Sequence, residues 1–200
     1  MSTLQALLAW TPFLLGGFAW NVAIACAAML LGTAAGAALA RARLSSAPWL
    51  RRPAEAATEL SRNVPTIVFQ FYLALMLPPD WVPTWLKAAL ALAVAVVGFT
   101  SDNLLIALRA WREGRHGAAL LFVPSWASFL LIIVIASSTA SIIGVGELVS
   151  RSNTVIAATA DTSLLVPVYL YACLIFFCFC WPLMAGLRRV RAVLGERLGS

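Results

Sequence analysis

The chain has 200 residues, of which 62% are hydrophobic and 11% are charged, and its mean hydropathy is +0.91. A water-soluble domain of this length carries about twice that share of charged residues. Composition therefore excludes an ordinary soluble domain and predicts an all-helical integral membrane protein, because lipid tolerates no unpaired backbone polar groups.

The first twelve residues, MSTLQALLAWTP, do not have the form of a cleavable signal peptide. They lack a basic n-region and a small-residue cleavage site before Phe13. We expect residues 1–12 to form a short helix along the membrane interface, with Trp10 at the level of the lipid headgroups.

Four apolar runs reach the roughly 20 residues that a helix needs to cross a bilayer. They are Phe13–Ala40, Trp85–Leu108, Ala118–Ile143 and Leu164–Leu187. A fifth run, Asn63–Pro79, is shorter but gains length from the helix-forming AEAATELS before it. Pro65 predicts a kink or a helix start near Val64. Residues 13–187 are therefore predicted to form a transmembrane domain of five helices, followed by a basic tail at residues 188–200.

The basic residues lie mainly in alternate loops of this prediction. The first loop, the third loop and the tail hold 12 of the 14, namely Arg41, Arg43, Arg51, Arg52, Arg62, Arg109, Arg112, Arg115, Arg188, Arg189, Arg191 and Arg197. Only Lys87 and Arg151 fall on the other side. Cytoplasmic loops carry an excess of Lys and Arg, so the N-terminus is predicted outside and the C-terminus inside. The net charge of +6 then reflects topology and contact with membrane lipid, not nucleic-acid binding.

Small residues recur at intervals of four in the first span, at Gly32, Gly36 and Ala40. They line one helix face and permit close helix contact. Packing within the chain is the favoured interpretation, and dimerisation is the alternative. The four cysteines, Cys26, Cys173, Cys178 and Cys180, lie inside predicted spans and match no zinc or redox spacing. We interpret them as small packing residues and expect no metal site and no cofactor.

Polar residues inside the spans are the candidate functional groups. Asp102 is a carboxylate within the predicted third span, and such residues mark functional sites by default. Its alternative is a structural carboxylate that bonds to neighbouring hydroxyls or reaches towards Arg109. Ser137, Ser138 and Thr139 cluster in the fourth span and indicate a bend or a polar lining.

Two stretches carry a resemblance to a known family. The stretch ATELSRNVPTIVFQFYLALMLP resembles the second-span signature of permease subunits of ABC importers for polar amino acids, the histidine/glutamine/arginine type. The stretch STASIIGVGELVSRSN is similar to a late segment of the same family. The matching residues are Glu59, Leu60, Arg62, Asn63, Pro65, Leu77, Pro78, Ser141, Ile143, Gly144, Val145, Glu147 and Leu148, with Gly146 in place of a proline. The resemblance covers about residues 13–190 and implies a type I ABC importer permease fold in the bacterial inner (cytoplasmic) membrane.

The sequence departs from this family in two places. The family's loop after the third core span carries a cytoplasmic Glu-Ala-Ala…Gly helix that docks on the ATPase subunit. Here nine residues, RAWREGRHG, occupy that place, with Arg109, Arg112, Arg115 and His116. The literal EAA at Glu55–Ala57 lies in a different loop. The family's polar Lys-Asp-Thr-Ser stretch corresponds here to residues 135–138, Ile-Ala-Ser-Ser, so both charges are absent.

The resemblance implies a transport subunit and not an enzyme, with ATP hydrolysis on a separate ATP-binding subunit. We expect the atypical half of a heterodimer whose partner permease keeps the coupling loop, together with a periplasmic or extracellular solute-binding protein. Candidate path-lining residues are Asp102, Ser137, Ser138, Thr139 and Gln70. On the outer face, Glu147, Arg151 and Asp161 either meet the binding protein or belong to an ordinary solvated loop. One alternative is a degenerate subunit that transports nothing and stabilises or regulates another membrane protein. Another is an ATPase that grips the short loop together with residues 54–62.

Overall fold

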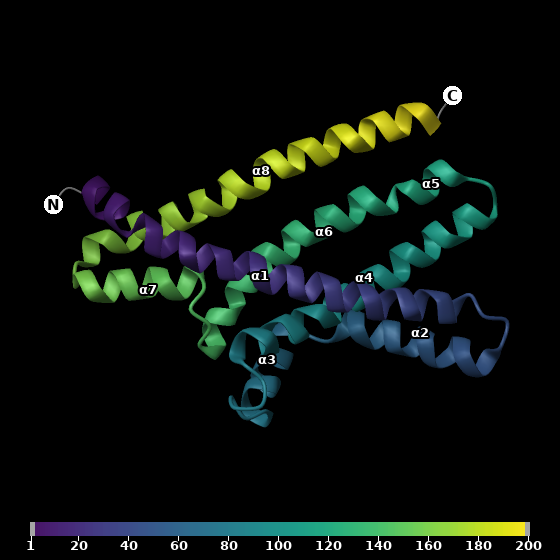
Figure 1. Ribbon diagram of the computed structural model, residues 1–200, viewed down its shortest axis with the longest axis horizontal. Coiled ribbons are helices and arrows are strands. Elements are labelled where there is room, and N and C mark those ends of the chain that lie inside the picture. The colour runs from purple at the N-terminus through teal and green to yellow at the C-terminus, as the bar shows by residue number, and fades with distance from the viewer. Residues whose placement is uncertain (1–2, 199–200) are drawn as a thin grey trace.

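A computed structural model describes the backbone of residues 3–198 and the side chains of residues 3–194. In that part of the chain all the regular structure is helical, and the helices form an elongated bundle (Figure 1). In chain order they are α1 (Thr3–Arg43), α2 (Pro48–Asn63), α3 (Thr66–Met76), α4 (Thr84–Arg112), α5 (His116–Leu120), α6 (Phe122–Ala136), the 3₁₀ helix η1 (Ser137–Ile143), α7 (Leu148–Thr159), the 3₁₀ helix η2 (Thr162–Leu164) and α8 (Leu165–Leu198).

Helices α1 and α4 pack closely against each other and run in the same direction. A Cβ atom added to Gly32 would lie 2.4 Å from Cβ of Val96, and one added to Gly36 would lie 2.7 Å from Cβ of Thr100. Both glycines are buried, as is Ala40. The small-residue face of α1 therefore packs within the chain, as predicted.

Parallel neighbours require the chain to return between them, and α2 and α3 make that return. Helix α2 ends at Asn63 and α3 begins at Thr66, so the predicted break near Val64 is confirmed. Pro65 lies at the junction because it disfavours helical backbone at the residue before it. At the far end of α3, the buried Lys87 of α4 donates a hydrogen bond to the Leu77 carbonyl and ties the two helices together.

A tight turn joins α4 to α5, and Gly114 supplies its positive φ of 76°. Helices α5 and α6 and η1 then run antiparallel to α1. Near one end Trp126 donates a 2.7 Å hydrogen bond to the Thr33 hydroxyl, and towards the other Asn21 donates to Ser137 at 3.0 Å. The link RAWREGRHG is thus a reversal between two helices (Figure 1).

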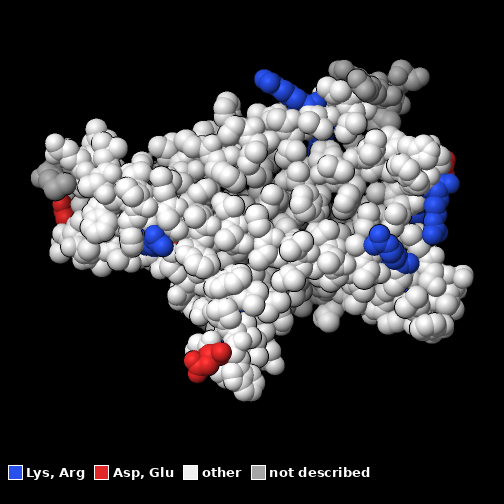
Figure 2. Space-filling model, in the orientation of Figure 1, with Lys and Arg blue, Asp and Glu red and all other residues white. Residues whose placement is uncertain are grey.

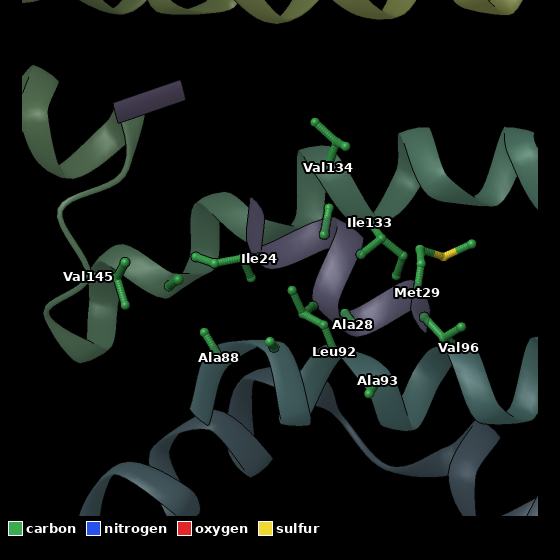
Figure 3. Close-up of a cluster of buried hydrophobic side chains, with 13 residues drawn as sticks. Ile24, Ala28, Met29, Ala88, Leu92, Ala93, Val96, Ile133, Val134 and Val145 are labelled. Atoms are coloured by element: carbon green, nitrogen blue, oxygen red, sulfur yellow. The ribbon is translucent and has the colours of Figure 1, made fainter. Parts of the chain in front are cut away.

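Helix α8 returns parallel to α1 and completes the bundle. Phe18 of α1 makes edge-to-face contacts with Phe176 and Phe179 at 5.3 and 5.2 Å between ring centroids. The main core lies between α1, α4 and α6, and Figure 3 shows Met29 of α1 beside Val96 of α4 and Ile133 of α6. Helix α1 therefore lies at the centre of the fold.

Four helical segments of the described chain are long and apolar enough to cross a membrane: Thr3–Arg43, Thr84–Arg112, His116–Ile143 and Thr162–Leu194. Each contains one of the four long predicted spans. The fifth predicted span corresponds to α3, whose 11 residues extend for about 17 Å, short of a bilayer's roughly 30 Å hydrocarbon core.

The N-terminal segment differs from the expected separate helix, because α1 runs without interruption from Thr3 to Arg43 and includes Pro12. Residues 3–12 therefore form the first turns of the first long helix. Residues 1–2 of that segment and 199–200 of the predicted tail lie outside the described residues, as does the Arg197 side chain.

Charged and apolar surfaces are segregated on the bundle. Figure 2 shows blue side chains at the right-hand end, near the α4–α5 connection, with others at the left and at the upper edge, while the middle of this face is almost uncharged. Large apolar side chains are exposed along the helices, including Leu30 (73%), Leu75 (80%) and Leu170 (65%). Exposed apolar surface on this scale fits contact with lipid or a protein partner. Cys26, Cys173 and Cys178 are also exposed, so they are not the interior packing residues that we expected.

Candidate functional site

Asp102 holds the basic end of the bundle together. Its Oδ1 accepts a 2.7 Å hydrogen bond from Arg43 at the end of α1, and its Oδ2 pairs with Arg62 of α2 at 3.0 Å. Arg43 also donates to the Ser101 hydroxyl at 3.0 Å, and that hydroxyl shares a 2.8 Å hydrogen bond with Thr58 of α2. We call these five residues the Asp102 cluster. It connects α1, α2 and α4.

The local sequence brings Arg62 to this cluster. Gly98 of α4 leaves room for α2, since a Cβ atom there would lie 2.7 Å from Cγ of Arg62 and 3.3 Å from its backbone nitrogen. Asp102 follows Gly98 by one helical turn, on the same face. Asp102 pairs with Arg43 and Arg62, and among the described residues neither a neighbouring hydroxyl nor Arg109, the two partners of its structural alternative, bonds to it.

Two polar cavities flank the Arg62–Asp102 pair. One, of about 400 Å³, is lined by Ser61, Arg62, Val64, Ala95, Phe99, Asp102, Asn103 and Phe129. The other, of about 330 Å³, is lined by Arg43, Glu55, Thr58, Glu59, Arg62 and Asp102. Arg62 and Asp102 line both cavities, so their ion pair borders each of them, and the Arg62 side chain is 60% exposed.

A second polar cluster lies deep in the bundle around Asn21 of α1. The Asn21 amide donates to Ser137 Oγ and Glu147 Oε2, both at 3.0 Å, and its oxygen accepts from the Leu148 backbone at 3.1 Å. Asn21, Ser137 and Glu147 are fully buried. We call them the Asn21 cluster. In this cluster both the NH₂ group and the oxygen of the Asn21 amide have hydrogen-bond partners, as a buried polar side chain requires.

Glu147 caps the N-terminus of α7. Its carboxylate accepts from the backbone N–H groups of Val149 and Ser150 at 3.0 and 2.9 Å. Burial raises the pKa of this carboxyl above its usual 4.5, and the hydrogen bonds from Val149, Ser150 and Asn21 oppose that shift. The Glu147 side chain is inaccessible, so its position fits neither of the two alternatives, contact with the binding protein or an ordinary solvated loop.

The two other residues expected on that face also have local roles. Arg151 donates a 2.7 Å hydrogen bond to the Phe13 carbonyl, and its guanidinium lies 4.8 Å from the Phe13 ring centroid. Asp161 is exposed and accepts from the Ser163 backbone at 2.9 Å.

Gln70 of α3 reaches η1, where its amide donates to the Thr139 hydroxyl at 2.9 Å. The Gln70 side chain is fully buried, and its Oε1 has no hydrogen-bond partner. Thr139, Ser137 and Ser138 each donate to the carbonyl three residues earlier. The expected bend takes the form of a change from α to 3₁₀ helix, which ends at Gly144 with φ of 89°.

The structure places the candidate path residues in two separate regions. Gln70 and Thr139 are in contact, with Ser137 and Ser138 on the same short helix. Asp102 belongs to the other cluster, which is about 33 Å away along α1, because 22 residues separate Asn21 from Arg43. Sequence reasoning missed Asn21, Arg43 and Thr58 as site residues. A single asparagine in an apolar span was the available signal for Asn21.

The remaining motif residues lie where helices end. Asn63 donates to the Glu59 carbonyl at 2.9 Å in the last turn of α2. In the short loop, Arg109, Arg112, Arg115 and His116 are exposed. Arg115 pairs with Glu113, and the His116 ring lies 4.4 Å from that of Trp111.

Comparison with known proteins identifies the fold. No protein-family model and no curated protein sequence matches the chain. A chain in the crystal structure of an amino acid ABC transporter with histidines superposes with a TM-score of 0.74 at 17% sequence identity, over 94% of this chain and 99% of that chain. The protein therefore has the fold of a chain of that amino acid ABC transporter.

Replacement of Asp102 by Asn removes the counter-charge of Arg43 and Arg62 while keeping the volume. Since Arg43 is mostly buried and Asp102 is 28% exposed, we expect a loss of about 1–2 kcal/mol in the free energy of unfolding. Denaturation in mixed micelles measures it. The matched control is Glu55→Gln, which breaks an exposed 3.8 Å pair with Arg51 and should cost less than about 0.5 kcal/mol. Equal effects of the two changes would contradict the role given to Asp102.

The raised pKa of Glu147 predicts that the free energy of unfolding depends on pH. Because its pKa is raised in the folded state, its contribution is fully present below pH 4.5 and is lost as the pH rises through the raised value. The Glu147→Gln variant should lack this decline above pH 4.5 in the same unfolding assay. Asp161→Asn is the control: the Ser163 hydrogen bonds lower the Asp161 pKa, so any effect of that exposed group appears below pH 3.8. Identical pH profiles for wild type and Glu147→Gln would refute the assignment.

Proposed function

We propose that this chain is the transmembrane permease subunit of an ABC importer for polar amino acids or related compounds. The fold likeness over 94% of the chain carries the proposal, because the matched structure is that of an amino acid ABC transporter. The family motifs fall where the fold needs them: Glu59–Pro65 spans the α2–α3 junction, and Gly144–Glu147 joins η1 to α7. ATP hydrolysis would belong to a separate ATP-binding subunit.

The proposed topology has five crossings of the bacterial inner membrane, with the N-terminus outside and the C-terminus inside. The parallel α1 and α4 need a crossing between them, and α2 and α3 together supply it. Arg41, Arg43, Arg109 and Arg112 lie at the C-terminal ends of α1 and α4, which supports a cytoplasmic location for that end.

The substrate path would run along the side of the chain formed by α3 and η1. Gln70 and Thr139 are its best-placed residues, because the Gln70 Oε1 is a buried acceptor still without a donor. Ser137 and Ser138 lie on the same 3₁₀ helix but donate their hydroxyl protons to the backbone. Asp102 lies at the basic end, where its pair with Arg62 borders two polar cavities and would act on release of substrate.

A second permease subunit would cover α3. One face of this helix is exposed and apolar, with Val68 (60%), Tyr72 (55%) and Leu75 (80%). The path residue Gln70 lies on the opposite, buried face of the same helix. The partner would also supply the coupling loop, since the α4–α5 connection here is a turn of Glu113, Gly114 and Arg115. A solute-binding protein would deliver substrate on the outer side of the membrane, opposite the coupling loop.

That short turn also favours the alternative of a degenerate, non-transporting membrane subunit. A rigid helix that docks on an ATPase needs more length than this exposed turn and the five-residue α5 provide. The two functions differ in what the chain binds, so composition of the native complex separates them.

The test is to purify the tagged chain from its native membrane in mild detergent and identify the proteins bound to it. We expect a second permease with a coupling loop and an ATP-binding subunit. Leu75→Gln on α3 should reduce recovery of the partner several-fold, while Leu170→Gln, at a residue that is 65% exposed on α8, should leave it unchanged. A homodimer bound directly to an ATPase would overturn the heterodimer, and recovery without any ATPase would favour the non-transporting subunit.

A further inference from the structure

An apolar groove separates α6 from α8 near the basic end of the bundle. Its volume is about 310 Å³, and it is lined by Ala127, Leu130, Leu131, Pro182, Leu183, Gly186 and Leu187. A Cβ atom added to Gly186 would meet nothing within 4 Å, so this part of the groove is open. No polar side chain lines it, which suits an acyl chain better than a polar solute.

A cationic polar site lies at the mouth of this groove. Arg191 reaches from α8 to α6, with Nη2 3.3 Å from Ser128 Oγ and 3.4 Å from both Ser125 Oγ and the Pro124 carbonyl. Such distances are at the long limit for hydrogen bonds, so these neutral acceptors hold the guanidinium weakly. Among the described residues no ion pair involves Arg191.

Helical spacing makes the groove and the Arg191 site continuous. Leu183, Leu187 and Arg191 follow one another at intervals of four on α8 and therefore share a face. On α6, which runs antiparallel, Leu131 lies beside the groove and Ser128 is one turn closer to Arg191. The apolar groove thus ends at one guanidinium and two hydroxyls, three residues before the end of the candidate span Thr162–Leu194.

We propose that this groove binds an anionic phospholipid, with one acyl chain between α6 and α8 and the phosphate at Arg191, Ser125 and Ser128. Basic sites between membrane helices bind acidic headgroups in this way. Affinity would come mainly from the phosphate contact, because a groove of Leu side chains is no more apolar than the lipid that it displaces. Arg188 and Arg189, which are also exposed, add positive charge nearby. The bound lipid would fill the space between α8 and α6 at the end where α8 has few other neighbours.

The experiment titrates the purified full chain with phosphatidylglycerol or phosphatidylethanolamine in detergent micelles and counts bound lipids by native mass spectrometry. Wild type should retain phosphatidylglycerol preferentially, and Arg191→Gln should weaken that binding about fivefold. Arg189→Gln, two residues away and off this face, is the matched control and should change it little. Arg191→Lys, which keeps the charge, should restore part of the binding. Gly186→Leu should fill the groove and lower binding of both lipids.

Three results would overturn the proposal. They are equal binding of the two lipids to wild type, equal loss in Arg191→Gln and Arg189→Gln, and displacement of phosphatidylglycerol by millimolar inorganic phosphate. The last result would assign the site to a soluble phosphate compound. The comparison of arginine variants does not need Gly186→Leu to fold, so a misfolded groove variant leaves the test intact.

Discussion

The close parallel contact of α1 and α4 is the constraint on which the rest of the structure depends. Gly32 and Gly36 let the two backbones approach until added Cβ atoms would collide with Val96 and Thr100. Two parallel neighbours joined by about 40 residues need a return path of the same length, and α2 with α3 provides it. The return places Arg62 of α2 beside Gly98, and the α1–α4 contact places Arg43, the last residue of α1, beside Asp102. Both ion pairs of Asp102 therefore follow from the contact between α1 and α4.

The two polar clusters act as ties between helices, because their members find partners on different elements. Asn21 joins α1 to η1 and to the start of α7, and the Asp102 cluster joins α1, α2 and α4. Among the described residues, three buried side-chain atoms have no hydrogen-bond partner: Gln70 Oε1, Arg43 Nε and Thr100 Oγ1. A buried polar atom without a partner is costly, and Gln70 Oε1 is the amide oxygen among the three, which is why we place the proposed path there.

The sequence predicts the long spans well, since runs of more than 20 apolar residues leave few alternatives in lipid. It also identifies the small-residue face of α1 and the break at Pro65, which depend on local steric rules. The partners of Asp102 could not be predicted, because Arg43 is 59 residues away in the sequence. Arg109, about two helical turns further along α4, was the nearest basic residue by number. Burial of Glu147 was missed for a similar reason: its spacing to Ser150 suits a helix cap, but its depth depends on where α7 packs against Asn21.

The most direct test of this architecture is the sidedness of two exposed residues, Ser46 between α1 and α2 and Asp80 between α3 and α4. Single cysteines at these positions, in a chain lacking the four natural ones, are labelled with a membrane-impermeant maleimide in intact and in permeabilised cells. The parallel α1–α4 pair predicts that Asp80→Cys reacts from outside and that Ser46→Cys reacts only after permeabilisation. Reaction of both from the same side would mean that α2 and α3 do not cross the membrane, and would contradict the parallel pair and the permease topology built on it.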